Sequence, residues 1–181
     1  MRAAFAIARV YVPRYLRRRK IAELVDATAK AFCVPAPALE GLSYDEQLSA
    51  FARFTRQSSD EALIRGDVND IENRLRENAY AIGLALRNEF GVKSLSDAMK
   101  VAGVVYQVIG IDFRGDAEGK ILIRKCFFSP FYTAETCRLI SSLDEGLLAG
   151  LSGCDHLHFE KRITEGGSFC EACLSFKAVQ R

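Results

Sequence analysis

The spacing of apolar residues changes once along this chain, and the change divides it into two parts. Up to Tyr106 the apolar side chains recur every three to four residues, which is the period of a helix with one buried face. From Ile109 onward they alternate, as they do in strands that bury one face. The sequence therefore predicts an α+β fold, in which a helical N-terminal half precedes a small antiparallel sheet of two hairpins with a helix packed on it.

Capping residues and helix breakers divide the first half. Residues 3–33 are typical of one helix, which Val34-Pro35-Ala36-Pro37 ends because proline lacks the amide donor and restricts its neighbour. Ser43-Tyr44-Asp45-Glu46 has the pattern of a capping box, and we expect it to begin a short helix through Phe54. Ser58-Ser59-Asp60-Glu61 has the same pattern and predicts another helix start.

Two further helices complete the first half. Asp67, which follows Gly66, can cap the longest helix, whose apolar residues fall largely on one face. Gly91 is a suitable C-terminal stop for this helix. Ser94 then caps a helix that reaches Tyr106.

The second half of the sequence predicts a hairpin, then a helix, and then a second hairpin. Residues 109–113 and 121–127 alternate on either side of a turn-like segment, residues 114–119. Residues 133–151 predict a helix that begins with a capping threonine and ends at Ser152-Gly153.

The last hairpin has a predicted register. If residues 154–164 and 169–177 are its strands, Gly166-Gly167 can form a two-residue turn. Three apolar pairs then share one face: Ile163 with Cys170, Phe159 with Leu174, and Leu157 with Phe176. On the other face Arg162 lies opposite Glu171, so one register satisfies both faces.

Length and charge limit the class of protein. The 181 residues fit one domain, with residues 1–106 as the helical part and residues 107–181 as the part that carries the candidate site. The net charge is only +2, so we expect no nucleic-acid partner. Residues 3–8 are too short an apolar run for a signal peptide, and no stretch approaches the ~20 apolar residues of a membrane span. We therefore expect a cytoplasmic protein. The sequence leaves open whether the protein forms a homodimer.

The N-terminal segment is basic. Residues 1–22 contain seven Arg and Lys residues and no acidic residue. The solvated face of a helix explains this composition, and contact with a membrane surface, nucleic acid or an acidic partner is the alternative.

Cysteines and histidines near the C-terminus suggest a metal site as one alternative. Without an export signal, we expect the six cysteines to be free thiols. Cys154, His156 and His158 would share one strand face with Glu160, and Cys173 would lie opposite Glu160. Such a patch could bind zinc, but its spacing matches no closed zinc module. We therefore expect no cofactor, with a polar sheet face as the simpler explanation.

Four other residues could line a pocket beneath the C-terminal sheet. Cys137 and Asp144 lie seven residues apart on one predicted helix, and hence on nearly the same face. Cys126 ends the strand before that helix, and Cys170 lies on the core face of the last hairpin. We expect Cys126, Cys137 and Asp144 to border one pocket with Cys170 in its wall, although ordinary capping and core packing explain each residue in isolation.

Several segments of the C-terminal third share a pattern with a known family. They are Lys125-Cys126-Phe127-Phe128, Glu135-Thr136-Cys137, Asp144-Glu145-Gly146 and the run from Phe159 to Cys170. Together they resemble the L-2-amino-thiazoline-4-carboxylic acid hydrolase family, whose helical half residues 42–55 also fit. Phe127 stands where the family usually has proline, and Gly167 where it usually has an acid.

The resemblance implies a hydrolase that opens a small cyclic amidine, the thiazoline, to an N-carbamoyl-cysteine product. The reaction is expected to need water or a thiolate to attack the ring carbon, an acid to protonate the leaving nitrogen, and a cation for the substrate carboxylate. By resemblance, Cys126, Cys137 and Cys170 are the candidate thiols and Asp144 the acid or base. Arg162 is the candidate carboxylate anchor, although the predicted register turns it outward.

The chain end is also similar to the 4-vinyl reductase-type small-molecule-binding domains. Those domains often bind zinc through a glutamate and three cysteines. When Cys170 is matched to the last cysteine, Arg162 replaces another cysteine and Phe159 replaces the glutamate, so the zinc site is not carried over. This second resemblance implies the alternative function, a non-catalytic small-molecule-binding or sensory domain.

Overall fold

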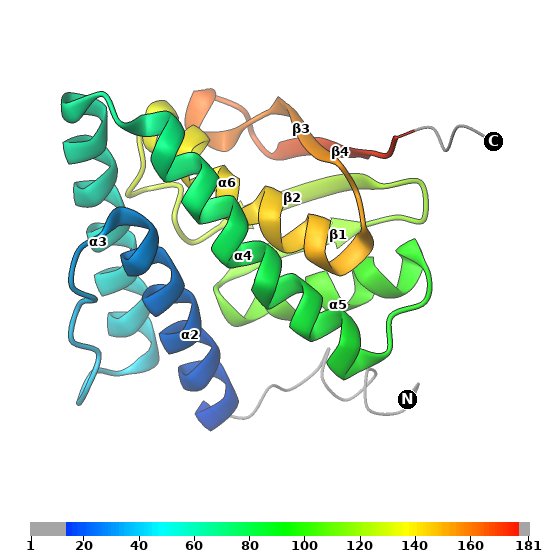
Figure 1. Cartoon of the computed structure of the whole chain (residues 1–181), viewed down its shortest axis with the longest axis horizontal. Helices are drawn as coiled ribbons and strands as arrows, with labels where there is room; N and C mark the ends of the chain where they lie inside the picture. The colour runs from blue at the N-terminus through cyan, green and yellow to red at the C-terminus, as the bar shows by residue number, and fades with distance from the viewer. Residues whose placement is uncertain (1–13, 178–181) are drawn as a thin grey trace.

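The computed structural model describes residues 14–177, and it confirms the expected α+β fold with a helical first half (Figure 1). The described helices are α2 (Arg14–Phe32), α3 (Tyr44–Arg65), α4 (Val68–Phe90), α5 (Leu95–Val108) and α6 (Ala134–Ser152). The described strands are β1 (Ile111–Gly115), β2 (Lys120–Cys126), β3 (His156–Lys161) and β4 (Cys170–Ser175), with the short 3₁₀-helix η1 (Ile163–Glu165) before β4. Of the predicted helix over residues 3–33, the part before Arg14 lies outside the described residues, as does most of the basic segment. None of the described helices combines the length and the apolar stretch that crossing a bilayer requires.

Helix ends follow the capping chemistry with two exceptions. Asp67 precedes α4, as predicted, but its side chain makes no capping hydrogen bond. Ser43 forms the expected capping box with Glu46, and Ser94 and Thr133 each accept a backbone hydrogen bond at the start of their helices. The predicted start at Ser58-Ser59-Asp60-Glu61 is wrong, because α3 continues through it. The Glu61 side chain, which would complete the box with Ser58, instead accepts from Gln57 Nε2 at 3.0 Å on the surface of the continuous helix.

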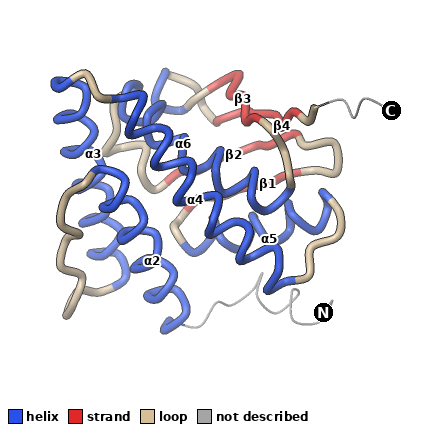
Figure 2. Tube along the Cα trace, in the orientation of Figure 1, coloured by secondary structure: helices blue, strands red, loops and turns tan. Residues whose placement is uncertain are grey.

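The four strands form one antiparallel sheet in the order β1-β2-β4-β3. The predicted first hairpin is β1 and β2, and the last hairpin docks on it where Ile123 of β2 faces Cys170 of β4. Buried and exposed residues alternate along β1, β2 and β4, so one face of the sheet is in the core. The helices gather on that side, and α4 lies across α6 (Figure 2).

The register of the last hairpin differs from the prediction by two residues. Leu157 faces Leu174, and Phe159 faces Ala172 in place of Leu174. The predicted two-residue turn at Gly166-Gly167 is also wrong, because residues 162–169 form a longer connection that contains η1. A shift of two residues keeps Leu157 and Phe159 on their predicted face, since the side-chain period of a strand is two.

Helices α4 and α6 approach each other through glycines. A Cβ atom added to Gly146 would lie 2.1 Å from the Arg76 carbonyl oxygen, and one added to Gly150 would lie 2.3 Å from the Tyr80 carbonyl oxygen. Gly83 of α4 makes the same kind of contact with the backbone of α6. This close contact sets where α6, and hence Asp144, sits relative to the other helices.

Candidate functional site

The structure encloses a cavity of about 450 Å³ between the helices and the sheet. Most of its wall is apolar and comes from α4, α5 and α6, including Ile82, Leu86, Val101, Val105, Ile140 and Leu147. Lys20 and Glu23 of α2 and the exposed Glu89 near the end of α4 form a charged border. A cavity of this size and polarity is typical of small-molecule sites.

The four residues predicted to border one pocket all line this cavity: Cys126, Cys137, Asp144 and Cys170. They come from the end of β2, from α6 and from the start of β4. The structure therefore brings together side chains that lie up to 44 positions apart in the sequence, counted from Cys126 to Cys170.

Asp144 is the carboxylate of this cluster. The hydroxyl of Tyr106, which is 2% exposed, donates a hydrogen bond to its Oδ1 at 2.8 Å. Burial raises the pKa of Asp144 to about 6, against the lowering effects of this hydrogen bond and of the Arg162 charge. Asp144 is half-buried and lines the cavity, so the carboxylate is available to a bound molecule.

Two of the thiols are poorly suited to be nucleophiles. Burial raises the pKa of Cys126 to about 12, although a backbone hydrogen bond at Phe128 opposes the shift. Burial also raises the pKa of Cys170, whose sulfur accepts the Ile163 N–H at 3.3 Å. The thiolate is the reactive form of cysteine, so both side chains are weak nucleophiles near neutral pH.

Cys137 has a different neighbourhood, because it lies next to Arg162. The Nη1 atom of Arg162 is 3.8 Å from the Cys137 sulfur and donates to Ser141 Oγ at 2.6 Å. Its guanidinium stacks 3.8 Å above the Phe159 ring, and Nε lies 3.9 Å from Glu165. Among the three thiols of the cavity, Cys137 is the one whose sulfur accepts a contact from a guanidinium.

The predicted outward orientation of Arg162 is wrong. Only 13% of its side chain is exposed, and it lies behind Cys137 and Ser141 instead of on the open face of the sheet. The reason is the bulge after Phe159, together with η1, which end the regular strand before Arg162 is reached. Lys161 takes the predicted place opposite Glu171.

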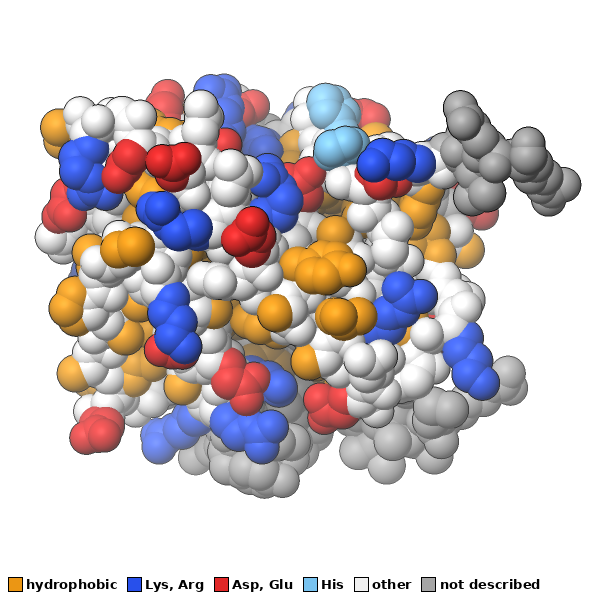
Figure 3. All heavy atoms as spheres, viewed as in Figure 1, with side chains coloured by type: hydrophobic (Ala, Val, Ile, Leu, Met, Phe, Trp, Pro, Cys, Tyr) orange, Lys and Arg blue, Asp and Glu red, His pale blue; other side chains and the backbone are white. Residues whose placement is uncertain are grey.

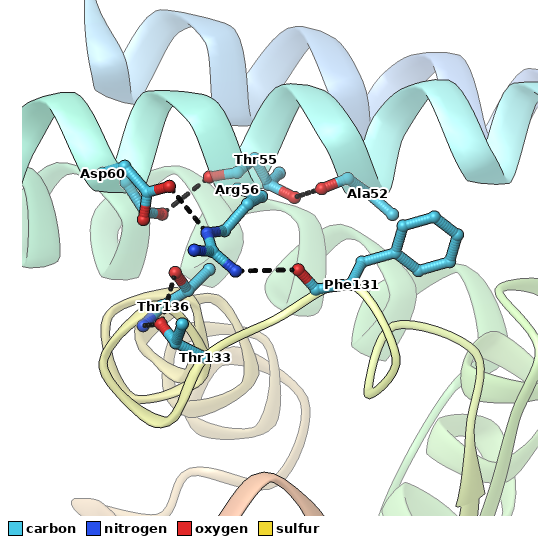
Figure 4. A network of polar contacts seen from close by, with 8 residues as sticks. Ala52, Thr55, Arg56, Asp60, Phe131, Thr133 and Thr136 are labelled. Carbon is cyan, nitrogen blue, oxygen red and sulfur yellow. Dashed lines mark hydrogen bonds and ion pairs between the residues drawn. The ribbon is translucent and has the colours of Figure 1, made fainter.

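The loop between β2 and α6 holds the strand-end thiol near the helix. Arg56 of α3 donates to Asp60 at 2.7 Å and to the Phe131 carbonyl at 3.2 Å (Figure 4). The Thr55 and Tyr132 hydroxyl oxygens are 2.5 Å apart. Because this loop follows Cys126 and precedes α6, these contacts with α3 fix one side of the cavity.

The polar residues of the site that were not predicted from the sequence include Tyr106, Ser141 and Thr164. Ser141 follows Cys137 by four residues on α6, so helical spacing alone could have found it. The Thr164 Oγ1 atom is buried and has no hydrogen-bond partner among the described residues. A buried hydroxyl without a partner is uncommon, and this oxygen has almost no accessible surface, so a molecule in the cavity does not reach it.

The zinc alternative does not fit the observed geometry. In residues 14–177, no group of three or more His, Cys, Asp or Glu side chains is placed to hold a metal ion. Cys154 is buried in the core, whereas His156 and His158 are exposed at the surface (Figure 3). The predicted shared face is wrong for Cys154, because it precedes β3 and the strand alternation does not extend to it. Cys173 faces His158 instead of Glu160.

Thiols and surface charge complete the description of the site and its surroundings. All six cysteines are free, as expected. On the face shown in Figure 3, acidic and basic side chains are intermixed, and no extended surface of one sign appears there.

Comparison of the chain with protein-family models, with curated proteins and with solved structures found no match. The functional argument therefore rests on the geometry of the cavity.

Proposed function

We propose that this domain binds a small, mainly apolar molecule whose polar group meets Asp144. The observation that carries the proposal is the cavity itself, which is about 450 Å³ in volume, mostly apolar in its wall, and supplied with one buried carboxylate. Protein cores pack densely and leave few voids larger than a water molecule. A cavity of this size is therefore better explained as a binding site than as a packing defect. The few polar groups in its apolar wall would orient a ligand.

An apolar fluorescent reporter, N-phenyl-1-naphthylamine, tests this proposal. We expect saturable fluorescence enhancement with the wild-type protein, because the reporter leaves water for an apolar site. Ile82→Trp fills the cavity from α4 and should weaken binding at least tenfold. Leu84→Trp, on the same helix but 40% exposed and outside the cavity, is the matched control and should bind like the wild type. Equal affinity of the two variants, or no saturable binding by the wild type, would contradict the proposal.

Hydrolysis of a small cyclic amidine is the second candidate function, and the convergence of Asp144 with three thiols favours it. Asp144 would act as general base, since a carboxyl with a pKa of about 6 is ionised at neutral pH and still accepts a proton readily. Water adds to the ring carbon while its proton passes to Asp144. The carbon–sulfur bond then breaks, and the thiolate takes up a proton to give the N-carbamoyl-cysteine thiol.

Release of a thiol from 2-aminothiazoline-4-carboxylate measures this activity directly. We expect Asp144→Asn to lower kcat/KM about a hundredfold or more, which is the usual contribution of a general base. The wild-type rate should rise with pH through about 6, because the base acts in its ionised form. Cys126→Ser should have little effect, as burial raises the pKa of that thiol, whereas Cys137→Ser tests the thiol beside Arg162. If the wild type binds the reporter but releases no thiol, the hydrolase proposal is wrong and the binding function stands.

A further inference from the structure

We propose, on the basis of the binding function above, that the ligand is a hydrophobic amine whose ammonium group pairs with Asp144 inside the cavity. The cavity combines an apolar wall for the body of such a molecule with one carboxylate for its charge.

The Asp144 carboxylate has acceptor capacity that the protein does not use. Among the described residues, the Tyr106 hydroxyl is the one hydrogen-bond donor to this carboxylate, and it reaches Oδ1. No Lys or Arg of the described residues forms an ion pair with Asp144 within 4.0 Å. An ionised carboxylate accepts several hydrogen bonds, so Oδ2 is free to accept from a donor in the cavity.

Arg162 does not supply the missing cation. Its guanidinium is held by Ser141, by the Phe159 ring and by Glu165, behind the residues that line the cavity. It lowers the pKa of Asp144 from a distance but does not contact it. Tyr106, Tyr132, Cys126 and Cys170 also lie near the carboxylate, and burial raises the pKa of each, so they are neutral at pH 7. Cys137 lines the same cavity.

Burial decides between the classes of ligand. A neutral ligand would cover an ionised carboxylate without neutralising it, which is costly in a site of low polarity. A carboxylic acid would place a second negative charge beside the first. An ammonium group adds charge-assisted hydrogen bonds to Oδ2 and neutralises the charge of the carboxylate.

A series with one apolar body separates these possibilities: 4-phenylbutylamine, 4-phenylbutanol and 4-phenylbutyrate, titrated calorimetrically at pH 7.5. We expect the amine to bind the wild-type protein at least tenfold more tightly than the alcohol, and the acid to bind most weakly. Asp144→Asn should abolish the difference between amine and alcohol. Glu145→Gln is the matched control, because that neighbouring carboxylate points away to Arg76 and His156 and does not line the cavity. It should retain the wild-type preference.

A second variant keeps the test decisive if Asp144→Asn folds poorly. Tyr106→Phe leaves the carboxylate but removes its one donor, so the preference for the amine should become larger. The inference is overturned if the alcohol or the acid binds as tightly as the amine, or if Glu89→Gln removes the preference and thereby assigns it to the cavity border. Failure of all three compounds and of the fluorescent reporter to bind would instead reject the proposed binding function.

Discussion

At the scale of single residues, Asp144 links the cavity to pH. Its folded-state pKa of about 6 lies above its ordinary value of 3.8, so the folded protein holds the proton more tightly than the unfolded chain does. The stability that this group contributes is therefore fully present below pH 4 and is lost as the pH rises through about 6. The cause is burial, which penalises the charged form more than Tyr106 and Arg162 stabilise it.

We expect Asp144→Asn to remove this pH dependence. Relative to the variant, the wild-type free energy of unfolding should fall by about 2–3 kcal/mol between pH 4 and pH 7, because each unit of pKa shift corresponds to about 1.4 kcal/mol. Urea denaturation of both proteins across this range measures the difference. A wild-type stability that runs parallel to that of the variant would show that Asp144 has an ordinary pKa.

Two buried threonines give a second prediction at this scale. Thr164 Oγ1 has no partner among the described residues, whereas Thr55 Oγ1 donates to a backbone carbonyl and lies 2.5 Å from the Tyr132 hydroxyl. Thr164→Val should change the free energy of unfolding by less than about 1 kcal/mol, since it removes no hydrogen bond. Thr55→Val should cost about 1–3 kcal/mol, because it leaves the Tyr132 hydroxyl buried with its partner removed. Equal losses in thermal or urea unfolding would refute this distinction.

At the scale of helices and strands, the contact between α4 and α6 determines the shape of the cavity. Gly146 and Gly150 lie about one helical turn apart on α6 and bring its backbone against that of α4. Neighbouring residues on the same helix, including Asp144 and Leu147, are thereby held in the cavity wall. Side chains on these glycines would separate the helices, because the neighbouring atoms belong to the backbone and cannot move aside.

We predict that Gly146→Ala destabilises the protein by about 2 kcal/mol or more, since its Cβ atom would lie 2.1 Å from a carbonyl oxygen. Gly103→Ala on α5 is the control. Its nearest neighbour lies at 3.9 Å, so the better helix propensity of alanine should stabilise the protein by about 0.5–1 kcal/mol. Chemical denaturation of the two variants should give shifts of opposite sign. The close-contact explanation fails if Gly146→Ala is as stable as the wild type.

At the scale of the whole molecule, the cavity lies where the helical part meets the sheet, so a ligand contacts most of the fold. Its wall includes residues of α2, α3, α4, α5 and α6 as well as β1, β2 and β4. A ligand that binds only the folded state stabilises it by RT ln(1 + [L]/Kd), which is about 2.7 kcal/mol at a hundredfold excess over Kd. For a domain of this size, such a gain raises Tm by roughly 5–10 °C at about 2–4 °C per kcal/mol.

We therefore expect 4-phenylbutylamine at a hundredfold excess over its Kd to raise Tm by several degrees in a thermal-shift assay. Ile82→Trp, which fills the cavity, should show little or no shift at the same concentration, whereas Leu84→Trp should shift like the wild type. A shift of equal size in Ile82→Trp would place the binding site elsewhere on the molecule.

The sequence predicted most of the elements because their signals are local. Ser43, Ser94 and Thr133 cap helices by bonding amides three residues away, and alternation of Ile and Phe residues is sufficient to identify β1 and β2. Helical spacing likewise placed Cys137 and Asp144 on one face of α6, so their presence in one cavity was predictable. The second capping box failed because Glu61 has an equally local alternative, the Gln57 side chain one turn earlier in α3.

Only the tertiary structure decided the chemistry of the site. Arg162 points inward because a bulge and a 3₁₀ turn interrupt β3, and no local pattern distinguishes that connection from a two-residue glycine turn. Tyr106 reaches Asp144 across 38 positions, and burial of that pair sets the carboxyl pKa near 6. The sequence by itself thus determined which residues form helices and strands and which side they face, since propensity and periodicity act between near neighbours. Distances between elements, desolvation and the unfilled volume depend on how those elements pack, and so the cavity and its electrostatics exist only in the folded chain.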